Sequence, residues 1–369
     1  MKLIRILHMI GSLNIGGSQA MVMNLYRNID RNKIQFDFII DHPDERHFAD
    51  EVKALGGKIY VMPGVKMTNI RQIRKAWDTF FKEHTEYKIL HSHVRSYASI
   101  YLPIAKKNQV FTVIHSHSTA NGKGIEAIIK SFLQYPLRYQ ADYYMACSDK
   151  AGRWLFGKRI LLSDKYKMFP NAIDGKRYVY NEQIRNNLRK KLGLKDEFVI
   201  GHVGRMTGAK NHVFLLDVFF EYHKQNNNSR LLLVGDGEEK SKIEEKCRKY
   251  HIEDSVIMVG NQSNVCDYYQ AMDFFVFPSV WEGLGMVLIE AQASGLCCVA
   301  SDTIPKETNI GSGKIMYLSL LESAKKWAET ISDVQISDRT DQLKYVKKSG
   351  YDITDNAKKM EEFYLNIFK

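Results

Sequence analysis

The sequence has few cysteines and no long apolar run. Its five cysteines are odd in number, form no C-x-x-C pair and lie scattered at positions 147, 247, 266, 297 and 298. This usage argues against a disulfide scaffold and against a cysteine zinc site, and it fits a reducing, cytoplasmic setting. No stretch reaches the roughly 18 apolar residues of a membrane helix, and residues 1–6 lack a signal-peptide core. We therefore expect a soluble, cytoplasmic protein.

Three common nucleotide-binding signatures are missing as well. The chain has no G-x-G-x-x-G of a classical NAD site and no G-x-x-x-x-G-K-[ST] of a P-loop. It also has no D-x-D, the usual acidic clamp for a divalent metal on a nucleotide diphosphate. If a diphosphate binds, protein cations must neutralise it, so no metal and no other cofactor is expected.

Positive charge is concentrated in the first half of the chain. The formal net charge is +11; residues 1–200 carry 33 Lys and Arg against 18 Asp and Glu, whereas residues 201–369 carry 20 against 24. The first half is therefore expected to meet an anionic partner, such as nucleic acid, a phospholipid surface or a phosphorylated acceptor. A generally lysine-rich surface would produce the same imbalance.

Strand-like and helix-like segments alternate along the chain, which is typical of parallel sheets with helices on both faces. Strands are predicted near 3–9, 36–40, 59–62, 89–92, 110–115, 143–147, 167–169, 198–203, 231–234, 256–259, 274–277 and 297–300. Helices are predicted at 18–29, 47–56, 69–83, 97–107, 125–139, 211–225, 239–250, 264–271 and 286–295. The prediction is an α/β protein with two Rossmann-like, doubly wound domains that face each other across a cleft.

The pattern restarts after a polar stretch, which sets the predicted boundaries. They are a first domain at 1–175, a linker at 176–197, a second domain at 198–350 and a C-terminal helix at 351–369. Whether this helix returns to the first domain is open. Ligands of such folds bind outside the carboxyl ends of the strands.

The most informative segment is E-G-L-G-M-V-L-I-E, residues 282–290. Glu282 is predicted in a loop and Glu290 in the first turns of a helix. The start of that helix offers unpaired N–H groups and the positive end of the dipole to a phosphate. The two carboxylates suit the sugar and the ribose hydroxyls of a sugar nucleotide. A buried helix with a glycine turn and two solvated glutamates is the alternative.

Arg205 and Lys210 follow the strand that ends at Val203 and precede the next helix. Arginine grips phosphate oxygens bidentately, and lysine adds a point charge. Fixed cations here would stabilise the negative charge that grows on a departing nucleoside diphosphate. An exposed basic turn is the other interpretation.

The first half contributes a glycine pair and several histidines. Gly16 and Gly17 lie between the first strand and the first helix, where glycine permits close backbone approach, and Ser18 is a candidate helix cap. His115 closes a strand, where an imidazole suits a sugar hydroxyl or a proton transfer, with His117 as the alternative. His91 and His93 repeat that spacing, but neither pair has a third metal ligand nearby in sequence, so no metal site is predicted.

Six motifs in order span almost the whole chain: G-G-S-Q at 16–19, a histidine after a strand at 115, P-N-A-I-D at 170–174, G-R-x4-K-N at 204–211, V-G-D-G at 234–237 and P-S-x-x-E-G-x-G-x4-E at 278–290. Together they resemble the retaining glycosyltransferases of family 4, which have the GT-B fold. The segment G-H-V-G-R-M-T-G-A-K-N is similar to sequences of the capsular and exopolysaccharide branch of that family.

The resemblance implies metal-independent transfer from a nucleotide sugar, by family habit a UDP-sugar. It assigns the diphosphate to Arg205, Lys210, Gly16 and Gly17, the ribose to Glu290, the donor sugar to Gly283, Leu284 and Gly285, and catalysis to Glu282 and His115. Glu282 is then an electrostatic stabiliser or a nucleophile.

The acceptor implied by the resemblance is a glycan or a polyprenyl-diphosphate-linked sugar at the inner membrane face. The basic, amphipathic stretch 124–139 suits a peripheral contact with an anionic membrane, although a core-facing helix has the same spacing. The alternatives are a non-hydrolysing nucleotide-sugar epimerase, a non-catalytic nucleotide-sugar-binding protein and, on charge alone, a nucleic-acid binder.

Overall fold

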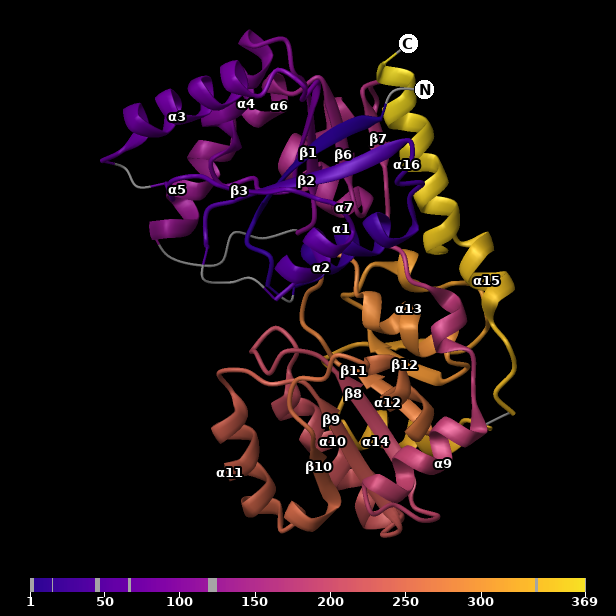
Figure 1. Ribbon diagram of the computed structural model, residues 1–369. Coiled ribbons are helices and arrows are strands. Elements are labelled where there is room, and N and C mark those ends of the chain that lie inside the picture. Colours follow the sequence, from indigo (N-terminus) through magenta and orange to yellow (C-terminus); the bar gives the residue numbers. More distant parts are fainter. Residues whose placement is uncertain are drawn as a thin grey trace. The chain divides into compact units, whose positions relative to one another are not determined.

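The computed structural model describes residues 3–14, 16–43, 47–65, 68–118, 125–335 and 338–368. It divides into two compact units (Figure 1), of which the first contains Met1–Ala172 with Ile353–Lys369 and the second Ile173–Asp352. Each unit is built on one parallel sheet with helices around it. The predicted pair of doubly wound α/β domains is thus confirmed.

The sheet of the first unit has seven parallel strands in the order β3-β2-β1-β4-β5-β6-β7. These are β1 (Ile4–Gly11), β2 (Ile34–Ile40), β3 (Ile59–Val61), β4 (Ile89–Ser92), β5 (Phe111–Ser116), β6 (Tyr143–Ala146) and β7 (Tyr166–Met168). Its helices are α1 (Gly17–Asn28), α2 (Ala49–Ala54), α3 (Ile70–Glu83), α4 (Ala98–Lys107), α5 (Ile125–Gln134), α6 (Leu137–Gln140), α7 (Asp149–Phe156), α8 (Lys158–Leu161) and α16 (Ile353–Ile367).

The prediction of a single helix at 125–139 is wrong, because the chain forms two helices there. It breaks at Tyr135 and Pro136, between α5 and α6. Proline lacks the N–H that a helix interior needs and disfavours helical geometry in the residue before it. Gly124, the first residue of the predicted amphipathic stretch, lies outside the described residues.

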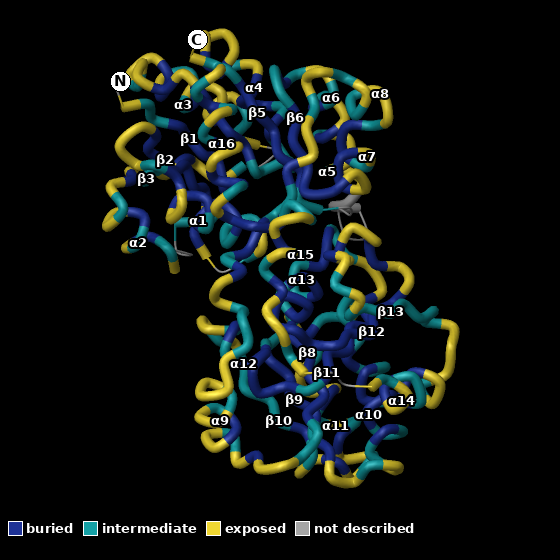
Figure 2. The backbone as a smooth tube through the Cα atoms, turned by 90° about the vertical axis from the view of Figure 1, so that its right-hand side faces the viewer, coloured by how far each residue is buried: buried dark blue, intermediate teal, exposed yellow. Residues whose placement is uncertain are grey.

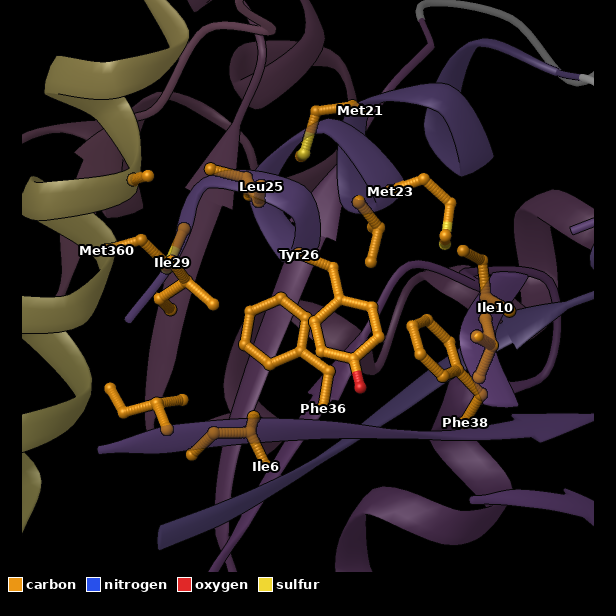
Figure 3. Packing of buried hydrophobic residues seen from close by; sticks show 14 of the residues in the cluster. Ile6, Ile10, Met21, Met23, Leu25, Tyr26, Ile29, Phe36, Phe38 and Met360 are labelled. Carbon is orange, nitrogen blue, oxygen red and sulfur yellow. The ribbon is translucent and has the colours of Figure 1, made fainter. Parts of the chain in front are cut away.

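Helix α16 closes the core of the first unit. Met360 and Tyr364 are fully buried in the same apolar cluster as Leu25 and Ile29. Figure 3 shows Met360 on the side of Leu25, which belongs to α1, and of Ile29, which directly follows that helix. A segment from the far end of the sequence therefore completes the packing around β1 and β2.

The second unit has six parallel strands in the order β10-β9-β8-β11-β12-β13. These are β8 (Phe198–Val203), β9 (Ser229–Val234), β10 (Val256–Met258), β11 (Phe274–Phe277), β12 (Cys297–Ser301) and β13 (Ile315–Leu318). The surrounding helices are α9 (Glu182–Lys191), α10 (His212–Gln225), α11 (Lys240–Tyr250), α12 (Val265–Ala271), α13 (Met286–Ala293), α14 (Ala324–Asp333) and α15 (Leu343–Lys348), with 3₁₀ turns η1 (Gly175–Tyr178), η2 (Glu253–Ser255) and η3 (Lys306–Thr308). Separate apolar clusters cover its two faces, and the strands are mostly buried (Figure 2).

Residues 176–197, which were expected to be a linker, contain helix α9, and this helix packs on α12. Arg185 and Arg189 of α9 form ion pairs with Asp273 at 2.7 and 3.3 Å. Charged side chains that look solvated in the sequence therefore hold α9 on the second unit.

Candidate functional site

Three loops meet at the carboxyl edge of the second sheet, after β8, β9 and β11. The Met206 amide donates to Asp236 O at 3.0 Å, and the Val280 amide donates to Ala209 O at 2.8 Å. Strand β8 lies between β9 and β11. The chain runs from β8 to β10 on one side of it and then crosses to β11 on the other side, so the strand order reverses at β8. In open α/β sheets this reversal of strand order is where ligands bind.

Two glycines allow the loops after β8 and β9 to touch. Gly235 has φ +133°, and a Cβ atom there would lie 2.2 Å from Gly204 O. A Cβ on Gly237 would lie 2.5 Å from Met206 O. No side chain fits at either position, so V-G-D-G brings two backbones together at the rim of the site.

Lys210 and Glu282 form the central ion pair of this edge. Lys210 Nζ lies 2.6 Å from Glu282 Oε1, and both side chains are largely shielded from solvent. The ammonium also lies 4.8 Å from the centre of the Phe277 ring, which attracts a cation. Asn211 has left-handed backbone geometry and donates from Nδ2 to Pro278 O at 3.2 Å, so it links the two loops.

Glu290 is the second acid of the site, one turn into α13. Gly285 precedes this helix with φ +93°, a conformation that favours glycine. The Tyr269 hydroxyl donates to Glu290 Oε2 at 2.8 Å. Desolvation raises the pKa of Glu290, and hydrogen bonds from Tyr269 and Tyr178 and the charge of Lys210 oppose that shift. Lys210 therefore acts on both carboxylates.

Arg205 differs from Lys210 in its exposure. Its side chain is 75% exposed and lies 3.4 Å from Glu238, which is also exposed. Exposed pairs of this kind contribute little to stability, so the guanidinium is available to a ligand. Gly283, Leu284 and Gly285 lie between the two acids, with Leu284 and Gly285 buried.

The other predicted site residues lie in the first unit. Helix α1 starts at Gly17 after Gly16, and a Cβ atom on Gly17 would meet no described atom within 4 Å. The backbone there is open to a ligand. Ser18 does not cap the helix, because α1 begins at Gly17 and Gly16 occupies the cap position. The Ser18 hydroxyl donates to Gln19 Oε1 at 2.9 Å.

His115 lies in β5 and is 1% exposed. Its ring stacks on that of His117 at 4.2 Å between centroids. Neither ring nitrogen of His115 has a hydrogen-bond partner among the described residues. Burial lowers the pKa of His115 well below its ordinary value.

The site also holds residues that the sequence motifs did not single out. Tyr269 and Tyr178 orient Glu290, and Phe277 supports Lys210. Tyr269 comes from a helix and Tyr178 from a 3₁₀ turn, each outside the glycine and acidic motifs. Tyr269 and Tyr178 approach Glu290 only in the folded structure, so local sequence patterns could not predict that they contact it.

Comparison with known proteins identifies the family. Residues 15–177 match the family model described as Glycosyltransferase Family 4, and residues 184–352 match the model described as Glycosyl transferases group 1. The putative glycosyltransferase EpsF of Bacillus subtilis (strain 168) is 32% identical over 366 residues, which cover 96% of this chain and 94% of the relative. The capsular polysaccharide biosynthesis glycosyltransferase CapH of Staphylococcus aureus is 23% identical over 381 residues, covering 99% of each chain.

A crystal structure of the Anabaena protein Alr3699/HepE in complex with UDP and glucose superposes with a TM-score of 0.78 at 16% identity, covering 98% of this chain and all of that one. This likeness shows the fold, and the sequence matches show the family. The chain belongs to the family 4 glycosyltransferases and is a glycosyltransferase with the GT-B fold.

Proposed function

We propose that the protein moves a sugar from a UDP-sugar to a lipid-linked glycan acceptor during polysaccharide assembly, with retention of anomeric configuration. The observation that carries the proposal is the Lys210–Glu282 pair, 2.6 Å long, beside Glu290 at the start of α13. One cation, two acids and a helix N-terminus at a strand-order reversal match the parts of a nucleotide sugar.

Each part of the donor has a partner in this arrangement. Lys210 and Arg205 neutralise the diphosphate, together with the amides that begin α13, and no metal is required. Glu290 accepts hydrogen bonds from the ribose hydroxyls. Glu282 and the backbone of residues 283–285 hold the donor sugar.

The reaction that fits these roles is a front-face substitution. The bond between the sugar C1 and the diphosphate oxygen breaks as the acceptor oxygen bonds C1 on the same face. The acceptor proton passes to the departing diphosphate oxygen. Lys210 and Arg205 stabilise the charge that grows on that group, and Glu282 stabilises the oxocarbenium-like carbon.

For the first unit we propose two further contributions. Gly17 offers an open backbone at the start of α1 to phosphate oxygens, with Gly16 at the cap position before it, and His115 offers an imidazole to a sugar hydroxyl. The choice of UDP draws support from the structural neighbour that binds UDP and glucose. The polysaccharide context draws support from the name of the capsular relative.

A thermal-shift comparison tests donor binding. In EDTA, UDP should raise the melting temperature by several degrees and more than GDP or ADP does, because protein cations alone neutralise the diphosphate. Glu290→Gln should reduce the UDP shift. A shift that appears only after Mg²⁺ or Mn²⁺ is added would contradict the proposal. Donor hydrolysis across a panel of UDP-sugars then identifies the sugar, and interconversion of the sugar without release of UDP would indicate an epimerase.

We also propose a peripheral contact between the first unit and an anionic membrane. No helix of the described part is long and apolar enough to cross a bilayer. Helices α5 and α6 and the turn between them nevertheless expose several large apolar side chains, with Phe132 81% exposed; the others are Ile128, Ile129, Tyr135 and Tyr139. Exposed apolar side chains on successive turns of one surface segment are typical of an interaction site.

Basic groups lie beside this apolar surface. Arg138 lies over the Tyr135 ring at 4.9 Å, and both residues line a surface pocket with Trp154. Lysine and arginine next to exposed aromatic and aliphatic side chains are typical of helices that lie in a lipid interface. Such a contact would bring the enzyme to an acceptor held in the bilayer.

Liposome sedimentation checks the membrane contact. The protein should sediment with vesicles that contain phosphatidylglycerol, and the bound fraction should fall as salt is raised, because the basic groups are screened. Phe132→Ser should lower binding severalfold. Leu321→Ser is the matched control, since Leu321 is also an exposed apolar residue but lies in the second unit. Equal binding to neutral vesicles, or no binding at low salt, would contradict this contact.

A further inference from the structure

We propose that the first unit binds one divalent transition-metal ion of the zinc type through His8, His91 and His93. The sequence shows only pairs of histidines at i, i+2. The structure adds the third ligand, because His8 on β1 pairs in register with His91 on β4. The ion belongs to the first unit, whereas Arg205 and Lys210, the cations proposed to neutralise the donor diphosphate, belong to the second.

The three histidines come together because two neighbouring parallel strands carry them. His8 and His91 are fully buried, and His93, directly after β4, is half-buried. The ring centroids of His91 and His93 are 4.4 Å apart, and that of His8 is 5.3 Å from each of them. The strands therefore fix the three imidazoles on one face of the sheet.

The spacing of the ring nitrogens suits a metal ion. One nitrogen from each ring lies within 4.8 Å of the other two. His8 Nδ1 and His93 Nε2 are 3.0 Å apart. A tetrahedral zinc ion with bonds of 2.0–2.1 Å holds its ligand nitrogens about 3.3 Å apart, so small ring movements would complete the geometry. Three imidazoles favour zinc, copper or nickel over magnesium or calcium.

The second nitrogens of two ligands already have orienting partners. His91 Nδ1 lies 2.6 Å from the Tyr364 hydroxyl on α16, and His93 Nδ1 lies 2.9 Å from His117 Nε2. Metal-binding histidines characteristically use their other nitrogen in this way, which fixes the ring and the tautomer. His91 Nε2 is buried without a hydrogen-bond partner among the described residues, so a bound ion would supply the partner it lacks.

A competing triad consists of His93, His115 and His117, which also offer nitrogens within 4.8 Å. No described side chain orients His115 through a hydrogen bond, although the backbone of Phe169 lies close enough to act on its ring. The first triad is better supported for this reason.

Cobalt(II) binding tests the site directly on the full chain. After dialysis against EDTA, the protein should bind one equivalent of Co²⁺ and show the strong visible absorption of four-coordinate cobalt, which Zn²⁺ should abolish by displacement. His93→Asn and His8→Asn should each weaken Co²⁺ binding at least tenfold. Zn²⁺ should also raise the melting temperature of the unaltered protein.

Two variants separate this site from the alternatives. His251→Asn is the matched control, because His251 is exposed and has left-handed backbone geometry that asparagine tolerates. It should bind Co²⁺ as the unaltered chain does. His117→Asn removes only the orienting contact of His93, so it should still show the four-coordinate absorption, at reduced affinity. Binding lost in His117→Asn but kept in His8→Asn would overturn the assignment in favour of the competing triad. Absence of four-coordinate Co²⁺ in the unaltered chain would overturn the site altogether, whatever the outcome of the UDP experiment.

Discussion

Replacing Lys210 with alanine should lower kcat/KM for sugar transfer by about 100- to 1,000-fold, or roughly 3–4 kcal/mol of transition-state stabilisation. Lys210 is shielded from water, lies 2.6 Å from Glu282 and acts electrostatically on Glu290. A cation in such surroundings is worth far more to a developing negative charge than one in solvent. The measurement is steady-state transfer with the donor found in the UDP-sugar screen.

Arg205→Ala should have a smaller effect than Lys210→Ala. The Arg205 side chain is 75% exposed, so solvent screens its charge more strongly. Lys242→Ala provides the matched control, because Lys242 is an exposed lysine of the same unit that pairs with Glu239 at 3.4 Å. That variant should transfer sugar at the unaltered rate.

Loss of Lys210 also removes an ion-pair partner of Glu282, which is costly at a shielded position. A double variant, Lys210→Ala with Glu282→Gln, separates the two effects. It should regain the thermal stability of the unaltered protein without regaining activity. A Lys210→Ala variant that folds and keeps more than about a third of the unaltered kcat/KM would refute the assigned role.

Gly235→Ala should destabilise the second unit by about 3–5 kcal/mol, the sum of backbone strain and a steric clash. Gly235 has φ +133°, outside the range that residues with a side chain adopt readily, and its Cβ would lie 2.2 Å from Gly204 O. The contacted atom belongs to the backbone, so it cannot move away by a change of side-chain rotamer. Urea unfolding followed by circular dichroism measures the change.

Gly193→Ala is the matched control for that substitution. Gly193 also has a positive φ, +72°, but a Cβ there would meet no described atom within 4 Å. The cost should be only the left-handed backbone penalty of about 1–2 kcal/mol. Equal destabilisation by the two substitutions would show that the contact between the loops after β8 and β9 does not control the stability of the unit.

Short segments of the sequence encode much of this architecture. Alternating apolar strands and amphipathic helices predicted the two α/β sheets, because side-chain period and turn residues are properties of short segments. The G-R-x4-K-N motif placed Arg205 and Lys210 after a strand, where parallel sheets gather their loops. The E-G-x-G-x4-E motif placed Glu282 in a loop and Glu290 at the start of a helix. The ion pair between Lys210 and Glu282 follows from that common edge.

Other features depend on contacts between distant segments, and local sequence patterns do not predict them. From its sequence, helix α9 resembles a solvated linker. In the structure, Arg185 and Arg189 of this helix form ion pairs with Asp273. The sequence of the C-terminal helix α16 has apolar periodicity, but it does not predict that this helix packs in the core beside α1. The hydroxyl that orients Glu290 belongs to Tyr269, 21 residues away in the chain.

Neighbouring residues alone specify the strand and helix pattern, the excess of positive charge in the first half and the residue types that follow the strands. Which of those residues meet depends on the tertiary fold. It brought His8 to His91 through strand register, Tyr364 to His91 through the return of α16, and Lys210 within reach of two acids. The reason is that strand order and helix docking are set by burial of apolar faces across the whole chain, and no local pattern encodes that choice of partner.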